Sequence, residues 1–207
     1  LIGLLSPSSG CIKVDGVALL KPLNLVHWRS KVSHVTQNVF LADTTIRSNI
    51  AFGLNTKDID ESRLKMVAKM ACLDDFVQAL PNGYDTIVGE NGSLLSGGQK
   101  QRISLARAII LQPQVIILDE ALAALDPSLR SQMINLLLDL QQQMGLAYIL
   151  ISHNLGIIRH FSDDIMVLSQ GKVVESGKTL DIMKNPQHKV TQKLLMNQNF
   201  QLKPRNI

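Results

Sequence analysis

A helix that opens with two glycines constrains the fold of this chain more than any other feature. Residues 95–99 read LSGGQ, and the helix that follows carries apolar side chains at helical spacing, namely Ile103, Leu105, Ala106, Ile109 and Ile110. One face of this helix can therefore pack while its start stays exposed. Glycines let an anion approach the backbone closely, and Ser96 can donate a hydroxyl hydrogen bond. The segment predicts an anion site, with an ordinary capped helix as the alternative.

An acidic pair follows a strand-like segment. Residues 115–118 read VIIL, which is typical of a strand buried on both faces of a parallel sheet, and Asp119 and Glu120 come directly after them. In open α/β sheets, ligands bind beyond the carboxyl ends of the strands. Two carboxylates at that place can hold a magnesium ion and activate a water molecule. The alternative is that they are only the polar start of a loop.

Two further polar residues stand where apolar segments end. Gln37 follows a predicted core strand over 32–36, and His153 follows the segment AYILIS. A lone glutamine or histidine at a strand end is usually only solvated, so neither residue decides anything alone. Their value lies in the order along the chain: glutamine, LSGGQ, acidic pair, histidine.

The segment after the acidic pair predicts a strand–helix–strand unit. Asp126 and Pro127 suit the N-cap and the first helical position, leucines recur at helical spacing, and Gly145 can end the helix. A strand over 146–151 follows. A right-handed crossover would place this strand parallel to the previous one and bring the acidic pair and His153 to the same edge of the sheet.

The remaining elements have weaker signals. Residues 1–5 are expected to be part of a helix, and residues 11–17 alternate as an antiparallel strand does. Asp58 can cap a helix, Gly171 marks a hairpin turn, and the tail from Asp181 onward is expected to be a helix followed by a poorly ordered end.

Composition narrows the class of protein. The chain has 207 residues, 45% of them hydrophobic, and a net charge of +4, without a basic block that would suggest nucleic-acid binding. It has no apolar run near the roughly 18 residues that cross a bilayer. Cys11 and Cys72 do not form a C-x-x-C pair, which argues against a zinc site and suits a reducing cytosol.

The ordered set of motifs resembles the ATP-binding cassette (ABC) family along nearly the whole chain. The resemblance implies an α/β fold: a P-loop NTPase (RecA-like) core with a mostly parallel sheet, an inserted helical subdomain and a small antiparallel β part. The core would comprise residues 1–49 and 113–180, and the helical subdomain with the LSGGQ signature residues 50–112. Residues 181–207 would form a C-terminal helix and tail.

The resemblance also implies roles for the motif residues, with ATP and Mg²⁺ as cofactors. Glu120 would be the general base, His153 would contact the γ-phosphate, and Asp119 and Gln37 would serve the metal. Nucleotide contacts would fall to Gln37, Ser96, Gly97, Gly98, Gln99 and Asp126. In the family, two cassettes form a dimer whose signature residues act on nucleotide held mainly by the partner. The implied partners are therefore a second cassette and a transmembrane domain, at the cytoplasmic face of the membrane.

The phosphate loop G-x-x-x-x-G-K-[ST] does not occur in the sequence. Because residues 1–5 resemble the helix that follows that loop, we expect a cassette truncated before residue 1; a natural degenerate protein is the alternative. In either case the polypeptide alone is expected to bind ATP weakly or not at all.

The two halves of the chain resemble different subfamilies. The front half is similar to exporter cassettes, especially lipid-linked glycan flippases, and its residues 86–90 match the exporter X-loop that meets the membrane domain. The back half is similar to ATP-binding subunits of peptide transporters, which favours a peptide substrate over a glycan. Departures from the family pattern occur at Asn91, Ala123 and Asn154. A regulatory or scaffold cassette, and a soluble ATPase of DNA repair or translation, remain as alternatives.

Overall fold

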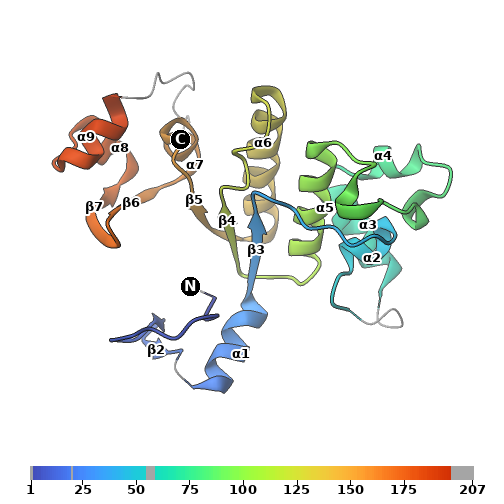
Figure 1. Cartoon of the computed structure of the whole chain (residues 1–207), viewed down its shortest axis with the longest axis horizontal. Helices are drawn as coiled ribbons and strands as arrows, with labels where there is room; N and C mark the ends of the chain where they lie inside the picture. Colours follow the sequence, from blue (N-terminus) through green and yellow to red (C-terminus); the bar gives the residue numbers. More distant parts are fainter. Residues whose placement is uncertain (1, 20, 55–58, 197–207) are drawn as a thin grey trace. The chain divides into compact units, whose positions relative to one another are not determined.

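The computed structural model describes residues 2–19, 21–54 and 59–196 (Figure 1). They fall into two compact units, Leu1–Ile149 and Leu150–Ile207, and the division runs through strand β5 (Ala147–Ile151). Each unit has buried apolar side chains of its own.

The first unit is built around a sheet with the strand order β3-β4-β5. Strands β3 (Val32–Thr36) and β4 (Val115–Asp119) are parallel, and their register runs from Val32↔Val115 to Thr36↔Asp119 (Figure 1). The middle of β4 is fully buried, as its continuous apolar run predicts. The predicted α/β fold with a parallel sheet is thereby confirmed.

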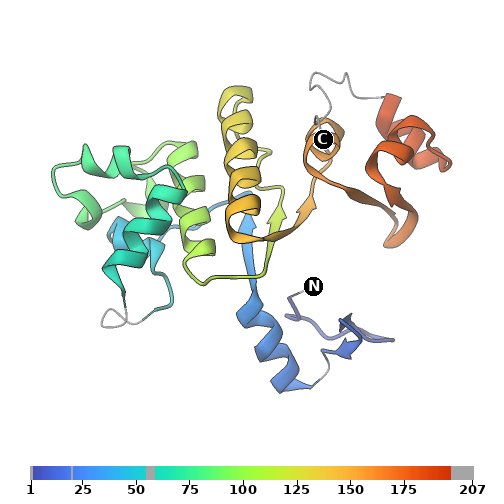
Figure 2. The ribbon, with the colours of Figure 1, turned by 180° about the vertical axis from the view of Figure 1, so that it is seen from behind.

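Helix α6 (Pro127–Met144) lies beside β4 (Figure 2). The Asp126 carboxylate accepts hydrogen bonds from the N–H groups of Ser128 and Leu129, both at 3.0 Å, and Gly145 ends the helix with a φ of 65°. Only glycine adopts this left-handed conformation freely. The predicted cap, first residue and end of this helix are all confirmed.

The LSGGQ motif belongs to a group of helices in the first unit (Figure 1). The group comprises α2 (Ile46–Ile50), α3 (Glu61–Met70), α4 (Asp74–Gln78), the 3₁₀ turns η2 (Gly83–Asp85) and η3 (Glu90–Gly92), and α5 (Gly97–Ile109). All five apolar residues predicted to face the core from α5 and its C-cap, Ile110, are buried. Helix α3 is capped by Asp60, which accepts from the N–H groups of Ser62 and Arg63. The predicted cap, Asp58, lies outside the described residues.

One expectation about the N-terminal segment is wrong, and a second is confirmed in part. Residues 2–5 are not helical: Gly3 has a φ of 69°, and Arg29, on helix α1 (Pro22–Lys31), donates to the carbonyl oxygens of Ile2 and Gly3. A left-handed glycine within so short a run prevents the first helical turn from forming.

The antiparallel character expected of residues 11–17 is confirmed, but the segment forms a hairpin of two strands and not one strand. Its strands are β1 (Lys13–Val14) and β2 (Val17–Ala18), which pair antiparallel. Asp15 and Gly16 between them both have positive φ, 49° and 78°. This is the combination that a two-residue hairpin turn requires, and Asp-Gly supplies it readily.

The second unit packs helices against an antiparallel hairpin. Helix α7 (Leu155–Phe161) precedes strands β6 (Asp164–Ser169) and β7 (Lys172–Lys178), which are joined at the predicted turn around Gly171. The expected helix near Asp181 is present, but as two helices, α8 (Thr179–Lys184) and α9 (Lys189–Met196). Residues 197–207, the rest of the expected tail, lie outside the described residues.

Glu175 on β7 anchors the start of α9. Its two carboxylate oxygens accept hydrogen bonds from the N–H groups of Gln187, at 2.8 Å, and His188, at 3.1 Å. The Thr191 side chain and these two backbone N–H groups lower the pKa of Glu175 from its ordinary value of 4.5. A lowered carboxyl pKa stabilises the fold above pH 4.5, and the contribution is lost as the pH falls through the folded-state pKa.

The Glu175→Gln variant is therefore expected to loosen α9. The carboxylate uses one oxygen for Gln187 and the other for His188, whereas the amide of glutamine has a single acceptor oxygen. Because one of these bonds is lost, we expect hydrogen exchange in α9 to be roughly three- to tenfold faster at pH 7. The difference from the wild type should shrink once the pH falls below the lowered pKa. Exchange measured by mass spectrometry, corrected for intrinsic rates, tests this. Glu90→Gln, an exposed change in the first unit, serves as the control. Equal exchange in α9 of Glu175→Gln and wild type at pH 7 would contradict it.

Candidate nucleotide site

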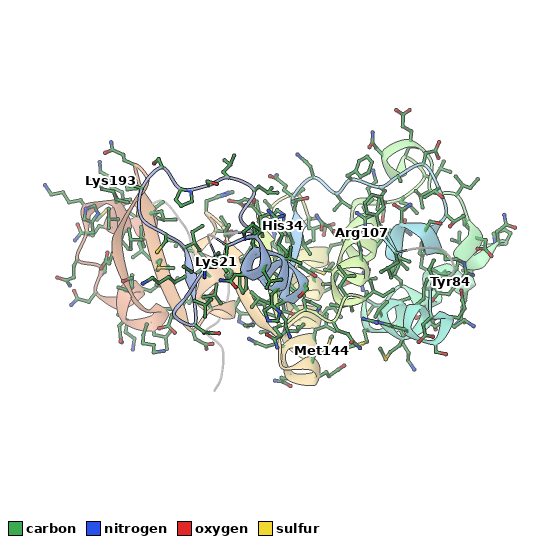
Figure 3. The ribbon with its side chains drawn as sticks, turned by 90° about the horizontal axis from the view of Figure 1, so that it is seen from below. Lys21, His34, Tyr84, Arg107, Met144 and Lys193 are labelled. Carbon is green, nitrogen blue, oxygen red and sulfur yellow. The ribbon has the colours of Figure 1, made fainter. Side chains whose placement is uncertain are left out.

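The parallel register of β3 and β4 sets the geometry of the site. Because Thr36 pairs with Asp119, the next residues, Gln37 and Glu120, leave neighbouring strands at the same edge of the sheet. The Asp119 side chain is 47% exposed, so it is open to a ligand. Sequence reasoning missed His34 on β3 (Figure 3), whose Nε2 lies 3.8 Å from Oδ2 of Asp119.

Glu120 begins a turn that holds the chain close to the strand end. It has a left-handed backbone, with a φ of 50°, and its carbonyl oxygen accepts from the N–H of Ala123 at 2.9 Å. Arg130 on α6 donates to the carbonyl oxygens of Leu122 at 3.2 Å and Leu125 at 2.8 Å. The loop between β4 and α6 is thus fixed at several points.

The signature residues form the start of α5 as predicted. Ser96 is the N-cap: its Oγ accepts from the N–H of Gln99 at 3.3 Å, and the Gln99 side chain accepts from the N–H of Ser96 at 2.8 Å. The Ser96 hydroxyl still has its hydrogen to donate, and the side chain is exposed. Gly97 is exposed and Gly98 is buried; a Cβ atom at Gly98 would lie 3.2 Å from Leu129, so glycine lets α5 approach α6.

The structure shows local roles for two other predicted site residues. The Gln99 side-chain oxygen takes part in the capping box, and the Asp126 carboxylate caps α6. These contacts account for both residues within one chain. The nucleotide contacts that the resemblance implies for them remain predictions.

His153 lies between β5 and α7, in the second unit. Its side chain is exposed, and its neighbours form a tight turn: the Asn154 N–H donates to Ser152 Oγ, and Asn154 Oδ1 accepts from the Ile157 N–H, both at 3.1 Å. Asn154 therefore caps α7, which explains a residue that departs from the exporter pattern.

The chain segment after Gln37 is attached to α5 by side chains that sequence reasoning missed. Gln101 donates to the carbonyl oxygens of Thr36 at 3.5 Å and Gln37 at 3.2 Å. Arg107 (Figure 3) donates to the carbonyl oxygens of Phe40 at 2.9 Å and Asn49 at 2.8 Å. Burial lowers the pKa of Arg107, but an arginine stays charged at any physiological pH. The sequence signal that could have revealed Gln101 and Arg107 is a polar side chain on the packed face of the predicted helix.

The X-loop-like residues 86–90 pair with the segment that leads into α2. The Ile46 N–H donates to the Thr86 carbonyl and the Val88 N–H donates to the Thr44 carbonyl, both at 3.0 Å. Ile87 is 58% exposed, so an apolar side chain is presented to the outside. A contact of this loop with a membrane domain remains a prediction.

A pocket of about 420 Å³ lies among four segments. It is lined by Gln37, Asn38, Val39, Phe40, Asn91, Gly97, Lys100, Gln101, Ala124 and Leu125. The start of α5, the Gln37 segment and the loop after Glu120 therefore border one hollow of the first unit.

The residues at the sheet edge fit a magnesium nucleotide. Mg²⁺ in such sites is usually held by one or two carboxylates together with phosphate oxygens and water. Asp119, with Gln37 directly after the neighbouring strand, supplies that kind of oxygen donor. Within residues 2–19, 21–54 and 59–196, no group of three or more His, Cys, Asp or Glu side chains is placed to hold a metal ion.

The comparisons with known proteins identify the family. The family described as ABC transporter matches residues 1–123. This chain belongs to the ABC transporter family. It is an ATP-binding cassette, and the resemblance predicted from the motifs is confirmed.

The cassette is similar to proteins of both predicted subfamilies. It is 42% identical over 85% of its length to an ATP-dependent lipid A-core flippase of Legionella pneumophila (strain Paris), and spans 29% of that protein. It is 36% identical over 94% of its length to a protein of Escherichia coli, and spans 72% of it. That protein is named "Putrescine export system ATP-binding protein SapF" in strain K12 and "Peptide transport system ATP-binding protein SapF" in strain O6:H1.

A solved structure supports the fold. A bacterial Atm1-family ABC exporter with ATP bound matches 95% of the cassette and 33% of that chain, with 32% sequence identity and a TM-score of 0.81. The cassette also spans only 13–29% of the length of the multidrug transporters and flippases that it matches. In the described part of the chain, no helix is both long and apolar enough to span a bilayer.

Proposed function

We propose that this cassette binds and hydrolyses ATP together with a second cassette and drives transport through a membrane domain, at the cytoplasmic face of the membrane. The observation that carries the proposal is the Thr36↔Asp119 register, which sets Gln37 beside the acidic pair. The exposed start of α5 adds a group that suits phosphate oxygens.

Each site residue has a proposed task. When bound, ATP supplies the phosphoryl group, and Mg²⁺ neutralises the charge that develops on it. Asp119 and Gln37 hold the metal, and Glu120 orients the attacking water and accepts its proton. His153 contacts the γ-phosphate. Nucleotide held by the partner cassette is bound by Ser96, Gly97, Gly98, Gln99 and Asp126. Residues 50–112 act as the helical subdomain.

A peptide or a lipid-linked glycan is the proposed substrate, and we favour a peptide. The match to SapF extends over more of this cassette than the match to the flippase, and over more of the relative's own length.

The exposed Ile87 in the X-loop-like segment supports an apolar contact with a membrane domain.

The function is tested by titrating a fluorescent ATP analogue against two preparations. One is the assembled transporter. It contains this cassette in a protein that includes a phosphate loop, together with the membrane domain and a second cassette. The other is the 207-residue polypeptide alone. Micromolar, Mg²⁺-dependent binding is expected for the transporter and weak or undetectable binding for the polypeptide, whose sequence has no G-x-x-x-x-G-K-[ST].

The two preparations separate two possible failures. A transporter that binds no nucleotide would contradict the proposed function and support a scaffold role. Micromolar binding by the polypeptide alone would contradict only the proposal that the phosphate loop is indispensable.

A further inference from the structure

We propose that Gln101 is a positioning residue that sets the place of Gln37 relative to Asp119. This inference rests on the proposed function, because it assigns to Gln101 the control of a metal-binding side chain. Gln101 lies on α5, five residues after Ser96, and its side chain is only 5% exposed. A glutamine so deeply buried needs hydrogen-bond partners, and the partners of Gln101 are backbone groups of the segment that carries Gln37.

Gln101 binds the chain at the point where it leaves the sheet. Its Nε2 donates to the carbonyl oxygen of Gln37 at 3.2 Å and, at 3.5 Å, to that of Thr36, the last residue of β3. Thr36 is also the residue that pairs with Asp119 on β4. The amide of Gln101 therefore holds the backbone of both residues that fix the position of the Gln37 side chain.

A second side chain of α5 holds the other end of the same segment. Arg107 donates to the carbonyl oxygen of Phe40 at 2.9 Å, and its guanidinium lies 4.9 Å from the ring centre of Phe52. Residues 37–40 are thus attached at both ends to the helix that begins with the signature. A shift of α5 carries Gln37 with it, so nucleotide contacts at Ser96 and metal contacts at Gln37 are mechanically linked.

Ser33 provides a matched control. Its Oγ donates to the Ala108 carbonyl at 2.8 Å in a buried hydrogen bond. This bond also joins β3 to α5, but at a distance of three residues from Thr36. A general loosening of the contact between strand and helix would follow from losing either bond. A specific effect on Gln37 would follow only from losing the bonds of Gln101.

The test measures ATP hydrolysis by the assembled transporter as a function of Mg²⁺ concentration. Gln101→Met keeps the size of the side chain and removes its donor. We expect it to raise the Mg²⁺ concentration for half-maximal activity by roughly tenfold, as loss of outer-shell support of a metal ligand does. Ser33→Ala should leave this concentration unchanged. If Gln101→Met does not fold, Gln101→Leu, an uncharged side chain that also lacks the donor, replaces it.

The Gln37→Ala variant separates this inference from the proposed function. It should raise the required Mg²⁺ concentration by itself, and adding Gln101→Met should then have no further effect. If Gln37→Ala leaves the Mg²⁺ dependence unchanged, the proposed metal role of Gln37 is wrong. If Gln37→Ala raises the required Mg²⁺ concentration, two results overturn the positioning role. One is that Gln101→Met changes this concentration no more than Ser33→Ala does. The other is that the effects of Gln101→Met and Gln37→Ala add fully in the double variant.

Discussion

The Glu120→Gln variant of the assembled transporter is expected to bind ATP as the wild type does and to hydrolyse it about 10²–10⁴ times more slowly. Glutamine has nearly the same shape as glutamate but cannot accept the proton of the attacking water. The turn that begins at residue 120 should survive, because it depends on the backbone bond from Ala123. Single-turnover hydrolysis and binding of a fluorescent ATP analogue, measured on the same preparation, give the two quantities.

Asp139→Asn is a suitable control for the loss of a carboxylate. Asp139 is exposed on α6, away from the strand end. Its substitution should change neither binding nor hydrolysis. Hydrolysis by Glu120→Gln at the wild-type rate would remove Glu120 from the mechanism, whereas loss of ATP binding would point to a structural role.

The His153→Ala variant is expected to lower the turnover of ATP strongly, by roughly 10²-fold or more. An imidazole donor near the γ-phosphate acts on charge that develops during the reaction, so the rate should fall more than the affinity. The exposed side chain of His153 can be removed without disturbing the cap that Asn154 provides for α7. The measurement is steady-state phosphate release, with kcat and KM determined separately.

His27→Ala removes an exposed histidine of α1 and should leave both constants unchanged. Wild-type turnover in His153→Ala would show that His153 does not take part. A rise in KM at constant kcat would assign it to substrate binding alone.

Features set by short stretches of sequence could be predicted. The cap at Asp126, the left-handed end at Gly145 and the two core strands all follow from residues within one element. The structure adds a parallel register of β3 and β4, which brings Gln37 and the acidic pair to one sheet edge. These predictions succeeded because local preference and the burial pattern favour the same structure.

Features set by distant contacts could not be predicted. Gln101 and Arg107 bind carbonyl oxygens more than 50 positions away, with sequence separations of 64 and 67 for the bonds to Gln37 and Phe40. No periodicity marks such a partner. The helix predicted near the N-terminus is absent from residues 2–5, which is an error of a different kind. Apolar residues alone do not reveal that Gly3 adopts a left-handed backbone.

The backbone at Glu120 has a consequence for engineering. A non-glycine residue with a φ of 50° carries a cost of about 1 kcal/mol that a glycine at this position would avoid. Glycine would relieve this strain but would add conformational entropy to the unfolded chain and delete the carboxylate. A screen for thermal robustness alone therefore does not protect Glu120, so any such screen needs an activity step.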